Sequence, residues 1–286
     1  MIFQILTDST ADLATQWLTE HQVDVLGLTV QLDGVHYETV GPDQLTSPVL
    51  LEKMAAGSQP TTSQINVGQF EAYFTEKAQS GIAVLYVAFS SALSGTYQSA
   101  VMARDMVLDD YPGATITIVD TLAASAGEGY LVMEAARLRD AGLSLEETCD
   151  KIADLASRLK THFLVDDLNH LMRGGRISKA SAFIGGLVNI KPIISIQRDG
   201  KLESVAKVRG RKKAMTEFIQ LALQDIAEPV AIVAYADDIE TAESIKERLL
   251  TEPSIEEVHL FPLGPIIAAH VGPGTQAIFT IGKQMR

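Results

Sequence analysis

A serine-rich turn in the first third of the chain could bind an anionic oxygen. The stretch Phe89–Ala100, FSSALSGTYQSA, follows the apolar run Ile82–Val87 and is followed by apolar residues at helical spacing. This pattern predicts a strand, a loop and a helix. Ser94 and Gly95 stand where the helix should begin, so hydroxyl groups and free backbone N–H groups would point into the same space. The alternative is that Ser94 only caps the helix.

A second polar stretch, Gly57–Gln64 with the sequence GSQPTTSQ, places Thr62 and Ser63 after a proline and before a predicted helix. Taken alone, this composition is typical of an ordinary turn. It becomes a candidate site only if the fold brings it close to the serine-rich turn.

Two aspartates and one histidine extend the set of candidates. Asp8 and Asp120 fall at or near the ends of predicted strands, as do Thr62 and Ser94. Ligand sites in parallel α/β sheets lie at the carboxyl ends of strands. Aspartates there more often bond to the backbone of their own turn. His270 lies in an apolar segment framed by glycines, where a histidine is more often hydrogen-bonded within the core.

These residue types leave two alternatives open, an enzyme and a protein that binds a sugar phosphate or a nucleotide. Ser94 could be a nucleophile with His270 as its base and Asp8 or Asp120 orienting the imidazole, which would give a serine hydrolase acting on acyl esters. The G-x-S-x-G motif of many hydrolases is absent. A sugar-phosphate or nucleotide site is the second alternative, although the sequence contains neither of the glycine-rich phosphate-binding motifs.

Regular alternation of strands and helices predicts an α/β fold with mainly parallel or mixed sheets. The character of the sequence changes near residue 160, so we expect two α/β domains, residues 1–160 and 161–286. The predicted strands are Ile2–Leu6, Val23–Val30, Val35–Val40, Ile82–Val87, Thr115–Val119, Ile193–Ile196, Leu202–Val205, Val230–Tyr235 and Val258–Phe261. The predicted helices include one that opens at Asp12, Pro42–Met54, Gly127–Arg139, Leu143–Leu159, Lys212–Ile226 and Ile239–Leu250.

Composition predicts a globular protein of the cytoplasm. The 286 residues carry a net charge of −13, yet Arg173–Lys213 contains eleven Lys and Arg against two acids, which suggests a docking face or an anion-binding rim. That segment lacks interleaved aromatic residues, so we expect no nucleic-acid binding. No apolar run approaches the ~20 residues needed to span a bilayer, and no signal-peptide core is present. A single cysteine, Cys149, allows neither an internal disulfide nor a thiolate zinc cluster.

Eight motifs that span nearly the whole chain resemble, in order, those of the DegV family, which includes bacterial fatty-acid-binding proteins. They are TDST at 7–10, TTSQ at 61–64, SSALSGTYQSA at 90–100, VDTLAASAGEGYLV at 119–132, VDDLNHLMRGGRIS at 165–178, IKPI at 190–193, KVRGRKKA at 207–214 and GPIIAAHVGPGT at 264–275. One departure lies at Ile65-Asn66-Val67, where family members often have prolines.

The resemblance implies two α/β domains with an apolar lipid tunnel between them. It implies a lipid carrier, not an enzyme, that binds a long-chain fatty acid and offers the carboxylate to a fatty acid kinase. The carrier would then take the acyl phosphate towards phospholipid metabolism. No cofactor or metal is implied besides the bound fatty acid. Loading would need brief contact with a membrane surface, for which Ala180–Val188, including Phe183, is the candidate segment.

Carried over by position, the resemblance also assigns the carboxylate site. Thr62 and Ser94 resemble the hydroxyls that hold the carboxylate, with the backbone of Ser63 and Gly95 nearby. His270 resembles the imidazole that approaches the same head group from the second domain.

Three arginines resemble residues near the head group and on the kinase-facing surface. These are Arg173, Arg176 and Arg209, with Arg211 as an alternative to Arg209.

Burial at about 0.8 kcal/mol per methylene would supply most of the affinity for a long acyl chain. The neutral head-group donors would then set the register of the chain.

Overall fold

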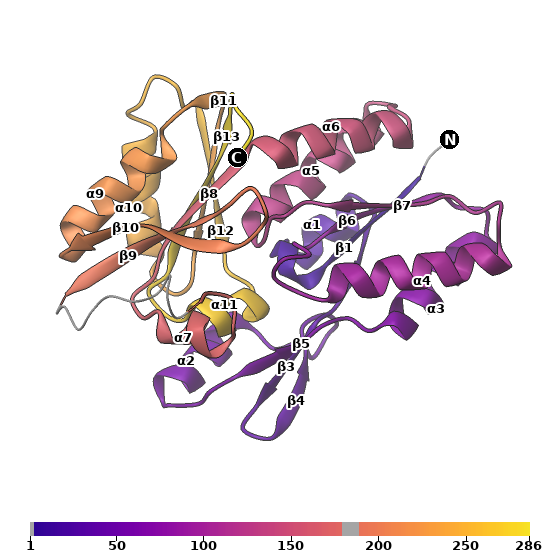
Figure 1. Ribbon diagram of the computed structural model, residues 1–286, viewed down its shortest axis with the longest axis horizontal. Helices are drawn as coiled ribbons and strands as arrows, with labels where there is room; N and C mark the ends of the chain where they lie inside the picture. The colour runs from indigo at the N-terminus through magenta and orange to yellow at the C-terminus, as the bar shows by residue number, and fades with distance from the viewer. Residues whose placement is uncertain (1–2, 179–188) are drawn as a thin grey trace.

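The computed structural model describes residues 3–178 and 189–286. Three sheets organise these residues, and Figure 1 shows the two larger ones in separate halves of the molecule. The expected α/β fold with parallel and mixed sheets is confirmed. The segment Ala180–Val188, with Phe183, lies outside the described residues.

The first half is built on a four-stranded parallel sheet with the order β2-β1-β6-β7. Its strands are β1 (Gln4–Asp8), β2 (Val23–Leu26), β6 (Val84–Ala88) and β7 (Ile116–Asp120). Its helices are α1 (Thr15–Glu20), α3 (Val67–Gln79), α4 (Thr96–Asp110), α5 (Ala126–Asp140) and α6 (Leu145–Arg158). Figure 1 shows α3 and α4 on one side of this sheet and α5 and α6 on the other. The residues of β6 are all buried, as a central parallel strand requires.

A small antiparallel sheet with the order β4-β3-β5 projects from this half. Its strands are β3 (Thr29–Leu32), β4 (Val35–Glu38) and β5 (Thr61–Ser63), and α2 (Ser47–Ala55) lies between β4 and β5 in the chain. Asp33 and Gly34, which both have positive φ, form the tight turn that joins β3 to β4. The segment Thr61–Ser63, expected as a loop, is a short strand paired with β3.

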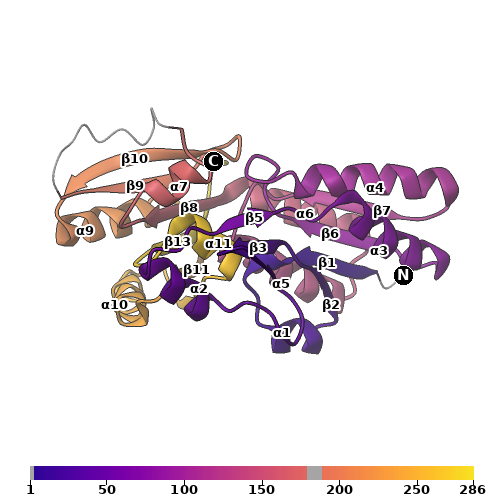
Figure 2. The ribbon, with the colours of Figure 1, turned by 90° about the horizontal axis from the view of Figure 1, so that it is seen from below.

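The second half is a six-stranded mixed sheet with the order β10-β9-β8-β13-β11-β12. Its strands are β8 (Leu159–Leu164), β9 (Ile190–Ile196), β10 (Leu202–Arg209), β11 (Ile226–Tyr235), β12 (Glu257–Pro262) and β13 (Gln276–Gly282). Its helices are α7 (Asn169–Arg173), α9 (Arg211–Ala222), α10 (Ile239–Leu249) and α11 (Pro265–Val271). Helices α9 and α10 cover the outer face of the sheet, at the far end of the molecule from α3 and α4 (Figure 2).

Four sequence-based boundaries are wrong for identifiable physical reasons. Residues 23–30 form two strands, since Leu28 N–H bonds to Ser9 Oγ (3.0 Å) instead of extending the ladder. No α-helix opens at Asp12, because this residue is left-handed (φ 55°) after a 3₁₀ turn, and α1 begins at Thr15. Helix α2 begins at 47 rather than 42, after Thr46 in extended conformation. Helix α9 ends at 222, before Asp225 with φ of 60° and the start of β11.

One hydrophobic core joins the two large sheets. It includes buried side chains of the first sheet, such as Leu85, together with Phe163 and Phe279 of the second. A separate cluster around Phe218 fills the space between the six-stranded sheet and its outer helices. We propose that the two sheets mark two domains that meet near residue 160, with the shared core at their junction.

Candidate functional site

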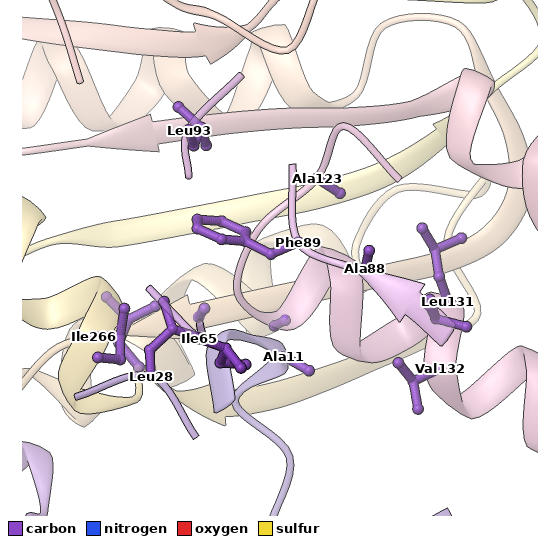
Figure 3. Close-up of a cluster of buried hydrophobic side chains, with 14 of the residues drawn as sticks. Ala11, Leu28, Ile65, Ala88, Phe89, Leu93, Ala123, Leu131, Val132 and Ile266 are labelled. Atoms are coloured by element: carbon purple, nitrogen blue, oxygen red, sulfur yellow. The ribbon is translucent and has the colours of Figure 1, made fainter. Parts of the chain in front are cut away.

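An apolar cavity of about 350 Å³ lies between the loops of the first half and the inner face of the six-stranded sheet. Its hydrocarbon lining comes from segments far apart in the chain. Figure 3 shows four of these side chains: Phe89 and Leu93 from the serine-rich turn, and Leu28 and Ile266 from two other segments. The other apolar lining residues are Ala124, Phe163, Leu171, Ile196, Leu202, Leu263, Ile267, Val271, Ala277 and Phe279.

Most polar lining residues belong to a set that we call the polar end of the cavity. It consists of Thr62, Ser63, Gln64, Ser94, Gly95, Arg176 and His270. Five of these were predicted as carboxylate-binding residues, and the fold brings all five to one cavity. The contact between the two halves is direct, since Thr62 Oγ1 lies 2.7 Å from His270 Nε2.

The serine-rich turn forms as predicted between β6 and α4. Ser94 N–H bonds to Ser90 O (3.2 Å), and Ser94 Oγ accepts a hydrogen bond from Thr96 N–H (3.2 Å). Ser94 therefore does satisfy a backbone donor at the start of α4, although Gly95 is the N-cap residue. Its hydroxyl both stabilises the helix start and lines the cavity.

Gln64 also belongs to the site, although the sequence alone did not identify it as a binding residue. Its Nε2 donates to Ser99 Oγ on α4 (2.8 Å), which ties β5 to the serine-rich turn. A Cβ at Gly95 would overlap the Gln64 side chain. Glycine at 95 thus allows the close approach of the Gln64 side chain to the serine-rich turn.

His270 lies on α11 with its ring packed against the backbone of Gly174, where a Cβ would overlap Nδ1. Burial, aided by the positive charge of Arg176, lowers the pKa of His270 to about 4. The imidazole is therefore neutral at physiological pH. It can take part in hydrogen bonds but adds no charge to the cavity.

The three predicted arginines take different positions. Arg176 lines the cavity, where Nε donates to Leu93 O (3.0 Å) and Nη1 donates to Gly174 O (2.5 Å). Arg173 is not part of the lining, and its Nη2 lies 2.8 Å from His170 Nδ1. Arg209 is exposed at the end of β10, also away from the cavity.

Each of the two aspartates accepts one backbone hydrogen bond from its own turn, as the more common alternative predicted, and another from the serine-rich turn. Asp8 accepts hydrogen bonds from Thr10 N–H (3.0 Å) and Phe89 N–H (3.2 Å), and Asp120 accepts from Ser91 N–H and Leu122 N–H (both 3.1 Å). Neither aspartate lines the cavity.

The serine hydrolase arrangement is not assembled in the described part of the chain. His270 Nε2 bonds to Thr62 and not to Ser94, whose Oγ pairs with Thr96. Asp8 and Asp120 are engaged elsewhere, so neither orients the imidazole. A Ser-His-Asp mechanism needs one hydrogen bond between serine and histidine and another between histidine and aspartate, and the geometry provides neither for these residues.

In residues 3–178 and 189–286, no helix combines the length and hydrophobicity needed to cross a membrane. Within the same ranges, no group of three or more His, Cys, Asp or Glu side chains is placed to hold a metal ion.

The fold and the site define an α/β protein with an apolar cavity whose polar end is closed by hydroxyls and a neutral imidazole. The DegV family model matches residues 2–283. A DegV domain-containing protein of Streptococcus pyogenes serotype M1 is 55% identical over 286 residues, which cover 100% of both chains. The chain therefore belongs to the DegV family.

Solved structures of the family share the whole fold. A DegV family protein from Thermus thermophilus, described by its fatty acid binding, is 33% identical with a TM-score of 0.88, over 99% of this chain and 100% of that one. A stearic acid-binding protein from Eubacterium ventriosum is 26% identical with a TM-score of 0.87, over 98% of each chain. DegV family proteins thus include fatty-acid-binding proteins with this architecture.

Proposed function

We propose that this protein binds a long-chain fatty acid, with its acyl chain in the apolar cavity and its carboxylate at the polar end. The observation that carries the proposal is the 2.7 Å contact between Thr62 and His270, which closes a cavity lined otherwise mainly by hydrocarbon. A fatty acid has the matching shape, one anionic group on a long apolar body. The fatty-acid-binding relatives of the same fold support this ligand class.

The carboxylate would be held by neutral donors. With a proton on Nε2, His270 donates to Thr62 Oγ1, which leaves the Thr62 hydroxyl proton for a carboxylate oxygen. The Ser94 hydroxyl and the backbone N–H groups of Ser63 and Gly95 lie at the same end of the cavity. Burial of each methylene contributes about 0.8 kcal/mol, so the acyl chain supplies most of the affinity.

The bound carboxylate would then be offered to a fatty acid kinase, and the protein would carry the acyl phosphate. Arg176, the cation at the polar end, suits the greater negative charge of a phosphate. Arg173 and Arg209 lie outside the cavity, where we propose that they face the kinase. In this proposal the protein is a cytoplasmic carrier that makes transient membrane contact and catalyses no step by itself.

Native mass spectrometry of the purified protein, followed by solvent extraction, tests the ligand class. We expect a stoichiometric fatty acid, or stoichiometric uptake of added stearate by delipidated protein. Replacing Thr62 with Val and Ser94 with Ala should weaken stearate binding by about 100-fold, since two charge-assisted hydrogen bonds are lost. Thr280→Val, whose hydroxyl bonds to Ala222 O away from the cavity, is the control. A protein that refuses both stearate and palmitate would overturn the proposal.

A further inference from the structure

A second polar position lies inside the cavity, apart from the polar end. Thr161 lines the cavity and is 3% exposed, yet among the described residues its Oγ1 has no hydrogen-bond partner. Nearly all buried polar groups in proteins are paired. An unpaired hydroxyl in the wall of a ligand cavity is therefore a candidate for pairing with the ligand.

Strand register places this hydroxyl away from the head group. Along β8 and β13, Phe163 pairs with Ala277 and Thr161 pairs with Phe279. Helix α11, which carries His270, precedes β13 in the chain. The pair that contains Ala277 is therefore closer to His270 along the chain, and the pair that contains Phe279 lies two residues further along the strand. Side chains two residues apart on a strand share a face, so Thr161 points to the same side as Phe163.

A second hydroxyl of the cavity wall comes from the residue that precedes α5. Ser125 is buried, lines the cavity and donates through Oγ to Asp12 Oδ2 (2.6 Å), which leaves its oxygen lone pairs free to accept. The start of α5 reaches this region, because a Cβ at Gly127 would overlap the Phe279 ring. The backbone of Ser125 has φ 57° and ψ −146°, a conformation costly for a residue with a side chain.

The third interior hydroxyl differs. Thr275 also lines the cavity, but its Oγ1 donates to Val271 O (3.1 Å) within its own turn. It therefore offers no free donor to a ligand.

We propose that Thr161, together with Ser125, forms an interior subsite for an oxygen atom on the acyl chain, so that the cavity accepts a long-chain fatty acid bearing a mid-chain hydroxyl group. A ligand hydroxyl there accepts from Thr161 and donates to Ser125. The subsite rests on the proposed function, because it assumes that an acyl chain fills the cavity. Plain acyl chains still bind, but they leave the Thr161 hydroxyl without a partner.

The test compares stearate with 2-, 10- and 12-hydroxystearate on delipidated protein by calorimetry. Thr161→Val removes the hydroxyl and keeps the shape of the side chain. In this variant we expect the ratio of the affinity for 10- or 12-hydroxystearate to the affinity for stearate to fall by about fivefold to tenfold, because one hydrogen bond is lost. The ratio for 2-hydroxystearate, whose hydroxyl stays near the carboxylate, should not move.

Two further variants complete the design. Thr161→Ser keeps a hydroxyl and should restore the ratio, whereas Thr275→Val, at a hydroxyl already paired, should leave it at the wild-type value. An unchanged ratio in Thr161→Val with normal stearate binding would overturn the subsite alone. Failure of the wild-type protein to bind stearate would overturn the proposed function and the subsite together.

Discussion

Two buried polar regions lie within the first half of the molecule and its junction with the second, and they differ in what their polar groups face. The polar end of the cavity, with Thr62, Ser94 and His270, faces open volume. The second region, which we call the carboxylate cluster, consists of Asp8, Asp12 and Glu128, and none of the three lines the cavity. Burial of polar groups therefore does not identify a binding site. The presence of free space beside them does.

The carboxylate cluster closes on itself through hydroxyl groups. Thr10 Oγ1 lies 2.6 Å from Asp8 Oδ1 and 2.8 Å from Glu128 Oε2, but its one proton can serve only one of them. A proton on Glu128 resolves this conflict. Burial and the neighbouring charge of Asp8 raise the pKa of Glu128 well above its ordinary value. Asp8 and Glu128 thus link the end of β1 to α5 and contribute to the fold, whereas Asp12 contacts the cavity wall through Ser125.

The largest predicted effect comes from filling the cavity. Ala277→Phe places a ring in the wall that β13 contributes, and we expect stearate affinity to fall by about 100-fold or more because the acyl chain loses its volume. Titration calorimetry measures the loss, and circular dichroism confirms that the variant is folded. Glu128→Gln, in the carboxylate cluster, should bind stearate as the wild type does. Equal binding by Ala277→Phe would show that the acyl chain lies elsewhere.

A pH dependence should separate His270 from the carboxylate cluster. The unfolded chain binds a proton at His270 near pH 6.5, whereas the folded chain does so only near pH 4. The unfolded state binds more protons between these values, so stability falls on acidification from about pH 6.5 towards pH 4. Between pH 7.5 and pH 4.5 the wild-type protein loses free energy of unfolding, and His270→Gln should make this loss about 2 kcal/mol smaller, as measured by urea unfolding.

His162 provides the internal comparison for that measurement. Burial lowers its pKa to about 4 as well, with a further contribution from the charge of Lys160, but it lies outside the cavity. His162→Gln should flatten the same part of the stability profile without changing stearate binding. A profile that His270→Gln leaves unaltered would mean that His270 is exposed to water in solution.

The smallest effect on stearate binding should come from neutralising the carboxylate cluster. A glutamine at 128 can donate to Thr10 and accept from Thr7, as the protonated acid does. The pKa of Glu128 is 4.5 in the unfolded chain and is raised in the folded protein, so the wild type loses stability as the pH rises above 4.5. Glu128→Gln avoids this loss and should be more stable than the wild type at pH 7.5. The difference should shrink towards pH 4.5. A destabilised variant at pH 7.5 would show that Glu128 is ionised in the folded protein.

Much of the fold could be predicted from sequence because its strands and helices alternate with clear turn signals. The serine-rich turn at Ser94 is one example, since an apolar strand and a helical pattern enclose it. Strand β13 is the main failure. Its sequence, QAIFTIG, has no period-two pattern because both faces are buried, and it follows a glycine-rich turn without a distinctive start signal.

The site could be assembled from sequence only through family resemblance. Composition and spacing gave no reason to place Thr62 beside His270, since 208 positions separate them. Composition and spacing also gave no indication of the contacts of Gln64 or of the unpaired hydroxyl of Thr161. Gln64 matters through its contact with α4, and Thr161 matters because a hydroxyl on a buried strand lacks a partner, which only the packed structure reveals.

The position of β13 has a consequence for biosynthesis. This strand lies between β8 and β11 in the sheet but follows both in the chain. During translation, β8 and β11 must therefore wait for residues 276–282 to leave the ribosome before the middle of the sheet can close. Ala277 and Phe279, which complete one wall of the cavity, are made with it. The wall of the cavity that β13 contributes can consequently form only after residues 276–282 have been synthesised.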